Sequence, residues 1–552
     1  MASVTEPDVI VIGSGPNGLV GASMLADEGW DVLVLEAQPD PGGAVRSGEL
    51  TQPGFVHDRF SAFYPLAAAS PVIRALHLED FGLQWRRAPV ALAHPTPDGE
   101  CAVLSTDLEE TAASLDNYRP GDGKGWRELY ARWERVSAHL VDALLTPFPP
   151  VRAGGRLAAA LGPREWANFA RFALLPVRAM ADEMFSGAGG PLLLAGNTLH
   201  TDLAPEQTLG GLFGWMLACL GQEHGFPVPE GGAGRLTDAL VRRLETRGGR
   251  VVCSTPVTSI EVRGRRAVAV RTAHGDEIGV RRAVLADVGA PALYGSLVHP
   301  EHLPPRILDG MRRFTYDHAT VKIDWALDRK IPWAAEPARR AGTVHLGDSL
   351  DHLTEYSAQL ATGRIPARPF VLIGQMSTSD PTRSPEGTEV VWGYTHVPHR
   401  VRGDAGGDLS GKWDARDTEA FVTRVERELE MRAPGFTDGI VGRHVLTPPM
   451  LEAEDANLVN GAVNGGTAQL HQQLIFRPTI GLGRAETPIK GLFLASASAH
   501  PGGGVHGACG ANAARAALFA DRRQRFLAAI SGFGVAAPAI ARRSDAEISR
   551  RA

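Results

Sequence analysis

The sequence is poor in cysteine and has no long apolar or basic run. Only four of its 552 residues are cysteine, and none forms a C-x-x-C pair, so we expect neither a redox disulfide nor a metal site. No stretch reaches the roughly 18 apolar residues of a membrane span. The most apolar candidate, residues 208–221, has the length of a buried helix. The net charge of −6 and the scattered basic residues argue against a nucleic-acid partner.

The first apolar run, residues 9–12, follows no positively charged segment and ends at a glycine. Both features are atypical of a secretory signal peptide. Free thiols also suit a reducing compartment. We therefore expect a cytoplasmic protein, long enough to form at least two domains.

A strand, a glycine turn, a helix and a second strand follow one another up to Glu36. Gly13 permits a sharp turn, Gly15 lets the backbone approach a pyrophosphate, and Gly18 lets the helix pack closely on the sheet. The free N–H groups at the helix start favour an anion, and Glu36 is placed to bind ribose hydroxyls. The pattern predicts dinucleotide binding by Gly13, Ser14, Gly15, Pro16, Asn17, Gly18, Glu36 and Ala37.

Two further glycine-rich segments favour a flavin over a nicotinamide dinucleotide. Gly42 and Gly43 allow a second close approach to the pyrophosphate, and Arg46 offers a fixed cation. Near the other end, an expected strand leads into a glycine loop at residues 500–507 and a helix of small residues. A helix start beside the flavin would stabilise the charge of the reduced ring. We expect this loop to contact the cofactor through Gly503, Gly504, Val505 and His506.

That last loop formally repeats the GxGxxG pattern, but no apolar strand with a terminal acid follows it. A second, nicotinamide-binding unit is therefore not expected.

Three motifs resemble those of the phytoene-desaturase superfamily of flavoproteins. They are the N-terminal fingerprint with PGGAVR at residues 41–46, VPEGGAGRLTDAL at 228–240, and HPGGGVHG at 500–507. Within the superfamily, the chain is most similar to the phytoene dehydrogenase-related branch, which includes the pyridine nucleotide-disulfide oxidoreductase domain 2-like proteins. The resemblance implies noncovalent FAD in a fold similar to amine oxidases and Rab GDP-dissociation inhibitors. It also implies that the backbone of Val257 contacts the adenine and that Ser61 passes the flavin ring.

We expect an α/β fold, with a Rossmann-type FAD-binding domain and an inserted α+β substrate domain. The predicted FAD-binding domain comprises residues 1–75, 225–300 and 481–535, the substrate domain residues 76–224 and 301–480, and a flexible tail residues 536–552. Within these pieces we expect a hairpin at 257–272 that turns at Gly264, a helical region from about 106 to 220, an antiparallel sheet with strands at 319–327 and 370–376, and a helix at about 416–433.

The candidate catalytic side chains are His500, His506 and Arg477, with His57 and His471 behind them. A neutral histidine could accept a proton, whereas a protonated one could balance a reduced flavin. Bracing of the glycine loop is the alternative role for His500. Arg477 could anchor a substrate carboxylate or form a surface salt bridge.

These observations favour an FAD-dependent dehydrogenase, desaturase or double-bond isomerase that acts by hydride transfer to flavin. Its expected substrate is a largely apolar small molecule, isoprenoid or polyene-like. An amine or amino-acid oxidase and a non-redox protein that binds a prenyl ligand are the alternatives. Oxygen or a quinone would accept the electrons, and a quinone would imply peripheral contact with a membrane. Nothing in the sequence indicates the oligomeric state.

Overall fold

A five-stranded parallel sheet carries the N-terminal motif in the computed structural model, which describes residues 6–533. In spatial order its strands are β21 (Leu492–Leu494), β13 (Ala283–Ala286), β1 (Val9–Ile12), β2 (Val32–Leu35) and β9 (Arg250–Val252). All four pairings are parallel. Because such a sheet is covered on both faces, its strands are continuous apolar runs. Three distant parts of the chain therefore meet in one sheet, while the predicted tail at 536–552 lies outside the described residues.

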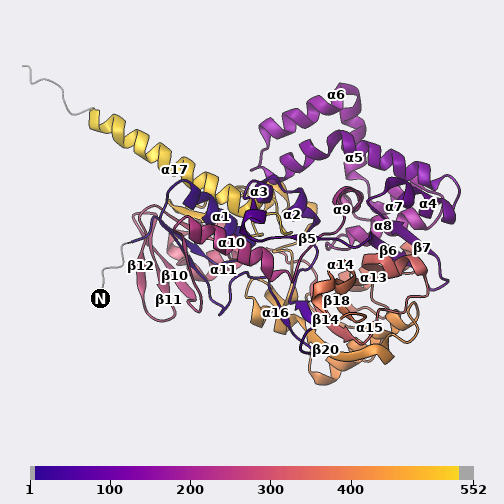
Figure 1. Ribbon diagram of the computed structural model, residues 1–552. Coiled ribbons are helices and arrows are strands. Elements are labelled where there is room, and N and C mark those ends of the chain that lie inside the picture. Colours follow the sequence, from indigo (N-terminus) through magenta and orange to yellow (C-terminus); the bar gives the residue numbers. More distant parts are fainter. Residues whose placement is uncertain (1–5, 534–552) are drawn as a thin grey trace, which may run out of the picture.

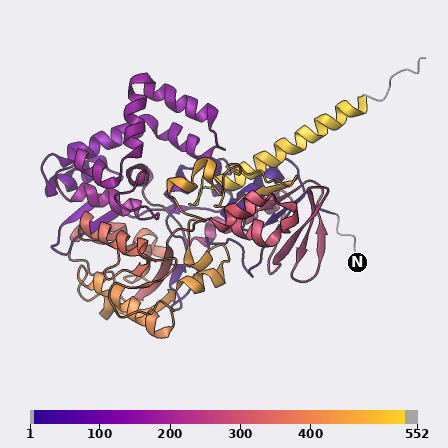
Figure 2. The ribbon, with the colours of Figure 1, turned by 180° about the vertical axis from the view of Figure 1, so that it is seen from behind.

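Three helices cover one face of this sheet (Figure 1): α1 (Pro16–Asp27), α10 (Gly234–Thr246) and α17 (Ala508–Phe533). Helices α1 and α17 touch backbone to backbone, because a Cβ at Gly510 would lie 1.8 Å from the carbonyl oxygen of Asn17. From this contact α17 extends outward, as both views show (Figure 2).

The other face is covered by the predicted hairpin, formed by β10 (Val257–Arg263) and β11 (Arg266–Thr272). The hairpin is extended by β12 (Glu277–Gly279). The turn lies at Gly264 and Arg265, both with positive φ.

The second sheet has seven strands in the order β20, β14, β18, β17, β15, β6, β7. Their bounds are Ile440–Leu446, Ala319–Leu327, Glu389–Val397, Val371–Gln375, Ala341–Leu346, Val90–Pro95 and Cys101–Leu104. The prediction of an antiparallel sheet was wrong at one pairing, because β15 pairs with β6 in parallel. Strands β6 and β7 come from an early part of the chain and extend a sheet otherwise built from residues 319–446.

Helices pack on both faces of the mixed sheet. One face and the β6–β7 end carry α4 (Leu108–Tyr118), α5 (Asp122–Leu145), α6 (Val151–Leu174), α7 (Val177–Met184), α8 (Gly189–Thr198), α9 (Gly210–His224) and α13 (Leu350–Ala361). The opposite face packs against α15 (Ala415–Glu430). Figure 1 shows the α4–α9 layer at the upper right, above the mixed sheet, and α15 at the lower right.

Short elements connect these layers. They are β3 (Ser47–Glu49), β4 (Val56–Asp58), β5 (Trp85–Arg86), β8 (Val228–Pro229), β16 (Arg364–Ile365), β19 (Gly403–Asp404), α2 (Pro65–Ala69), α3 (Pro71–Arg74), α11 (Ala290–Ala292), α12 (Pro305–Arg312), α14 (Met376–Ser379) and α16 (Pro448–Glu454). Among the helices of residues 6–533, none is apolar over a length that would cross a bilayer.

Candidate functional site

The first glycine turn joins β1 to α1 at the carboxyl edge of the parallel sheet. Gly13 has a φ of +92°, and a Cβ at Gly18 would lie only 2.3 Å from the Gly13 carbonyl oxygen. The helix therefore packs as closely on the turn as the sequence predicts. At the end of β2, the Glu36 carboxylate accepts hydrogen bonds from the Ser14 backbone N–H at 2.8 Å and from the Ser14 hydroxyl at 2.6 Å.

The second glycine pair lies directly against this turn. The Gly42 N–H donates to the Ser14 carbonyl and hydroxyl oxygens, both at 3.1 Å. A Cβ at Gly43 would lie 3.2 Å from the Cα of Gly15. Residues 13–18 and 42–43 thus form one cradle of closely packed backbone, in which five of the eight residues are glycine. We call these eight positions the glycine cradle.

Arg46 connects the second glycine pair of the cradle to the segment around Glu454. Its guanidinium donates to the carbonyl oxygens of Gly43 and Glu454, at 2.9 and 3.0 Å, and lies 5.1 Å from the centroid of the Phe60 ring. The predicted flavin-edge residue Ser61 donates its hydroxyl to the Ala44 carbonyl at 2.7 Å. Arg46 and Ser61 are therefore both anchored to the segment that follows the second glycine pair.

The chemistry of the cradle fits the pyrophosphate and ribose of FAD. The helix start offers N–H groups to an anion, whereas the Asn17 side-chain oxygen, buried without a partner, is an acceptor that suits a hydroxyl group. On the far side of β2, the Thr255 N–H donates to the Glu36 carbonyl at 2.7 Å. This contact brings the start of β10, and with it Val257, close to Glu36 and Ala37. When bound, FAD supplies a hydride acceptor.

The C-terminal glycine loop occupies a narrow space between three segments. A Cβ at Gly503 would lie 2.8 Å from the Asn464 carbonyl oxygen, and one at Gly504 would lie 2.8 Å from a methyl carbon of Leu66. Val505 packs against the apolar cluster on the α1 face of the parallel sheet. The tight contacts explain why the loop needs glycine at these positions.

His500 and His506 are both buried beside this loop, as neutral rings. Burial lowers the pKa of each to about 4, against opposing hydrogen bonds to backbone groups. The His500 Nε2 donates to the Thr146 carbonyl at 3.1 Å, which leaves its Nδ1 buried without a partner. The His506 Nδ1 accepts from the Ala508 N–H at the start of α17. Neither ring is placed to carry the positive charge of a counter-ion to reduced flavin.

Arg477 makes no surface salt bridge. Its side chain is 1% exposed, and its guanidinium donates to the carbonyl oxygens of Thr467, Asn464 and Ala497 at 2.7 to 3.1 Å. These bonds tie the 464–467 segment to the strand end before the glycine loop. We therefore interpret Arg477 as a positioning residue. The further candidate His471 has an exposed side chain.

A buried charged cluster on β14 is absent from the sequence predictions. Lys322 and Asp324 lie two residues apart on one face of the strand and form an ion pair at 2% and 0% exposure. His57 and His444 approach the same carboxylate, with Nδ1 at 3.6 and 3.8 Å. Burial raises the pKa of Asp324, but Lys322 and the two rings outweigh it and hold it below its usual range. The sequence signal that could have revealed this cluster is the pair of charged residues, Lys322 and Asp324, within an otherwise largely apolar strand.

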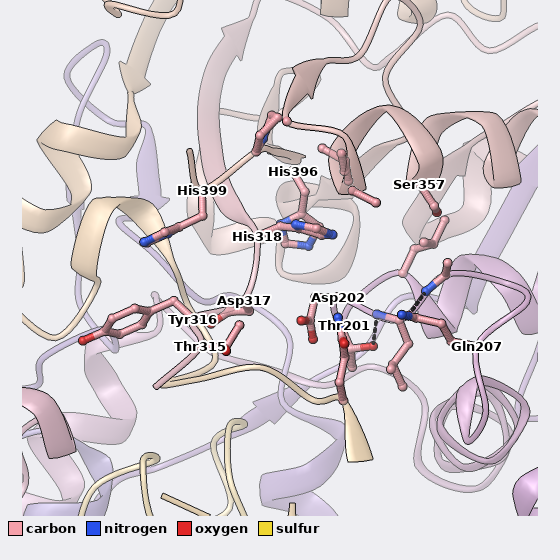
Figure 3. A pocket seen from close by; sticks show the side chains of 18 of the residues that line it. Thr201, Asp202, Gln207, Thr315, Tyr316, Asp317, His318, Ser357, His396 and His399 are labelled. Carbon is pink, nitrogen blue, oxygen red and sulfur yellow. Dashed lines mark hydrogen bonds between the residues drawn. The ribbon is translucent and has the colours of Figure 1, made fainter. Parts of the chain in front are cut away.

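A cavity of about 470 Å³ lies between the α8–α9 connection, α13 and the adjoining ends of β14 and β18. Figure 3 shows Asp202, Asp317, His318, His396 and His399 among the side chains that line this cavity. The two carboxylates also bind the backbone of the segment that Arg477 contacts, residues 464–468. Asp202 accepts from the Ala468 N–H at 2.7 Å, and Asp317 accepts from the Asn464 N–H at 3.0 Å. The cavity therefore adjoins the segment that packs on the glycine loop.

The polar groups of this cavity are only partly satisfied. The Asp317 Oδ1, His396 Nε2 and His399 Nδ1 atoms are buried without hydrogen-bond partners. Burial, and then the neighbouring Asp202, raises the pKa of Asp317 to about 7. Burial, and then His318, lowers the pKa of His396 to about 4. The cavity thus combines a neutral imidazole ring with a carboxyl group whose pKa lies near physiological pH.

All four cysteines are unpaired. Within the part of the chain that the structure describes, no group of three or more histidine, cysteine or acidic side chains is arranged to hold a metal ion.

Relatives match nearly the whole chain. Pyridine nucleotide-disulfide oxidoreductase domain-containing protein 2 of Rattus norvegicus is 27% identical, over 92% of this chain and 93% of its own. A component of the limonene dehydrogenase of Castellaniella defragrans is 24% identical, over 93% and 95%. The neurosporene-forming phytoene desaturase of Cereibacter sphaeroides is 25% identical, over 93% and 94%. These matches confirm the superfamily and branch that the motifs indicated.

Solved structures share the fold. An oxidoreductase from Methanosarcina mazei superposes with a TM-score of 0.61 at 15% identity, over 92% of this chain and 99% of its own. Putrescine oxidase bound to putrescine gives 0.58 at 14% identity, over 93% and 98%. Both likenesses confirm the predicted fold class. The sequence profile of the flavin containing amine oxidoreductase family matches residues 17–518, so this chain is an FAD-dependent oxidoreductase that belongs to that family.

Proposed function

We propose that the protein dehydrogenates, desaturates or isomerises a carbon–carbon bond of a largely apolar small molecule, with hydride transfer to bound FAD. Oxygen or a quinone is the proposed electron acceptor. The same proposal assigns the predicted cofactor contacts to the glycine cradle, Glu36 and residues 503–506. It places the protein in the cytoplasm, with peripheral membrane contact if the acceptor is a quinone.

An apolar wall beside the glycine loop is the observation that carries this proposal. Leu66 touches Gly504, and Phe63 packs edge-on against Trp392 with ring centroids 5.8 Å apart. Tyr394 continues the wall, 5.1 Å from Trp392. Because Trp392 and Tyr394 are two residues apart on β18, both rings lie on the same face of the sheet, toward Phe63. Such a wall favours a substrate that buries hydrocarbon.

The names of three full-length relatives also support carbon–carbon chemistry. They describe one component of a limonene dehydrogenase and two phytoene desaturases. Limonene and phytoene are hydrocarbons, which agrees with the apolar wall.

Anaerobic titration of the purified holoprotein tests the proposal. Limonene, a polyene and a cyclic enone are added separately, and the visible absorbance of the flavin is followed. The expected result is bleaching of the flavin, or conversion of the added compound without net bleaching if the reaction is an isomerisation. If no hydrocarbon or enone reduces the flavin or is converted, the proposed substrate class is wrong.

An amine oxidase is the second candidate, because Asp202 and Asp317 place two carboxyl groups in the cavity of Figure 3. A carboxylate pair can hold an ammonium group. In that case, amines should reduce the flavin anaerobically and release peroxide in air. Asp317→Asn should then weaken turnover of the amine, and Ser357→Ala on the same cavity should not.

A further inference from the structure

Asp287 lies in the place where the fingerprint offers its N–H groups to an anion. It follows the end of β13, next to β1 in the parallel sheet, and its side chain is 5% exposed. Its Oδ2 accepts the Gly18 N–H at 2.7 Å. A Cβ at Gly15 would lie 2.7 Å from the same oxygen. The carboxyl group therefore fills the bottom of the glycine cradle.

The surroundings of Asp287 are rich in acid. Burial raises its pKa to about 7, the Gly18 N–H opposes this, and Asp455 and Glu36 raise it further. Arg46 is a cation that acts on Asp455, and its guanidinium is already bonded to the carbonyl oxygens of Gly43 and Glu454. Asn457 adds a neutral contact, donating to the Asp287 backbone carbonyl at 3.2 Å.

A dinucleotide brings two negative charges of its pyrophosphate into this cradle. Like charges a few ångströms apart in a buried site disfavour simultaneous ionisation, and one helix start stabilises only about half an elementary charge. An ionised Asp287 and the pyrophosphate therefore compete for the same N–H groups. A protonated Asp287 removes the repulsion and adds an O–H donor.

We propose that FAD binding is coupled to the uptake of one proton by Asp287, which makes this residue the determinant of the pH dependence of cofactor retention. The proton comes from solvent, no covalent bond is made or broken in the cofactor, and release of FAD returns the proton. Linkage then requires that the affinity for FAD falls as the pH rises above about 7.

The experiment measures FAD release from the purified holoprotein between pH 6.5 and 8.5 by the fluorescence of the freed flavin. The wild type should bind FAD about 16-fold more weakly at pH 8.5 than at pH 7, the change expected when binding takes up one proton and the group has a pKa of about 7 in the free protein. Asp287→Asn keeps the shape and is permanently neutral, so it should lose most of this dependence and retain more FAD at pH 8.5. The matched control is Asp317→Asn, which removes another buried aspartate with a raised pKa and should keep the wild-type slope.

Calorimetry provides a readout that needs no variant. FAD is titrated into flavin-depleted protein at pH 7.5 in Tris and in phosphate, whose heats of ionisation differ, and the difference gives the number of protons taken up. Uptake approaching one proton supports the proposal. Zero uptake, proton release, a flat pH profile in the wild type or an unchanged slope in Asp287→Asn each overturns it, and all are independent of which substrate the enzyme oxidises.

Discussion

Removing the charge of Asp324 should leave the buried ammonium group of Lys322, on β14, without its direct counter-ion. In the folded protein the Lys322 side chain is 2% exposed and pairs with the Asp324 carboxylate. The rings of His57 and His444 approach that same carboxylate, and the more distant acids Asp58 and Glu454 also act on the Lys322 ammonium group. Asp324→Asn keeps the shape of the side chain but leaves Lys322 without its direct counter-ion. Breaking a buried pair in this way costs about 3 to 5 kcal/mol.

Deprotonation of Lys322 sets an upper limit to this cost, and the limit depends on pH. Losing the proton at pH 7.5 costs about 1.36 kcal/mol for each of roughly three pH units below the ordinary lysine pKa, or about 4 kcal/mol in total. At pH 9 the same argument gives about 2 kcal/mol. In the variant, the unfolded chain binds the proton that the folded chain lacks, so the stability of the variant relative to wild type rises with pH.

Urea unfolding of the holoprotein, followed by tryptophan fluorescence, measures this difference, and Trp325 and Trp392 lie in the same sheet. Asp324→Asn should be destabilised by about 3 to 4 kcal/mol at pH 7.5 and by about half as much at pH 9. The double variant Lys322→Met/Asp324→Asn removes the stranded cation, so it should recover stability and lose the pH dependence. A cost that does not change with pH, or a double variant no more stable than the single one, would refute the reasoning.

Three further outcomes are expected. Gly18→Ala should lose most of its flavin, because the new Cβ would lie 2.3 Å from a backbone oxygen of the same turn. The control Gly48→Ala, whose Cβ would have nothing within 4 Å, should keep its flavin. The ratio of visible to ultraviolet absorbance measures both, and equal flavin content in the two variants would contradict the role of the glycine cradle. The free energy of unfolding should fall as the pH drops from 6.5 to 5, by up to about 2 kcal/mol for each neutral buried ring such as His396 or His506, because these histidines are protonated in the unfolded chain before they are protonated in the folded one. A His396→Gln variant whose stability falls as steeply with pH as that of the wild type would exclude this ring as a cause. Arg477→Lys should lower the melting temperature and flavin content, because an ammonium group cannot reach three carbonyl oxygens in fork geometry; an unchanged melting temperature with a raised KM would instead favour substrate anchoring.

The sequence predicted the parallel sheet well because its signals are local. The β1 turn, α1 and the acid at the end of β2 follow one another within one supersecondary unit. The hairpin of β10 and β11 is equally local, with its turn at Gly264. In these cases, the residues that determine the structure are also neighbours in the chain, so periodicity and turn chemistry suffice.

The mixed sheet and its cavity depend on contacts that no local pattern records. Strand β6 pairs with β15 across about 250 residues, and in the parallel sense. The cavity combines Asp202 and Asp317 with the end of β18, and each comes from a different segment. Single histidines and aspartates are common in loops, so only the folded arrangement shows which of them converge.

The two sheets explain why the cofactor could be predicted and the substrate could not. In a parallel sheet the carboxyl ends of neighbouring strands share one edge, so Gly13 after β1, Glu36 after β2 and Asp287 after β13 must lie together once the strands pair. That edge presents backbone N–H groups and acids that follow from strand position alone. The mixed sheet has no carboxyl edge shared by all its strands, because every pairing except that of β15 with β6 is antiparallel. Its polar groups therefore depend on individual side chains, which can change while the fold is kept. Substitutions along the Trp392 and Tyr394 face should accordingly alter substrate choice and leave FAD content unchanged.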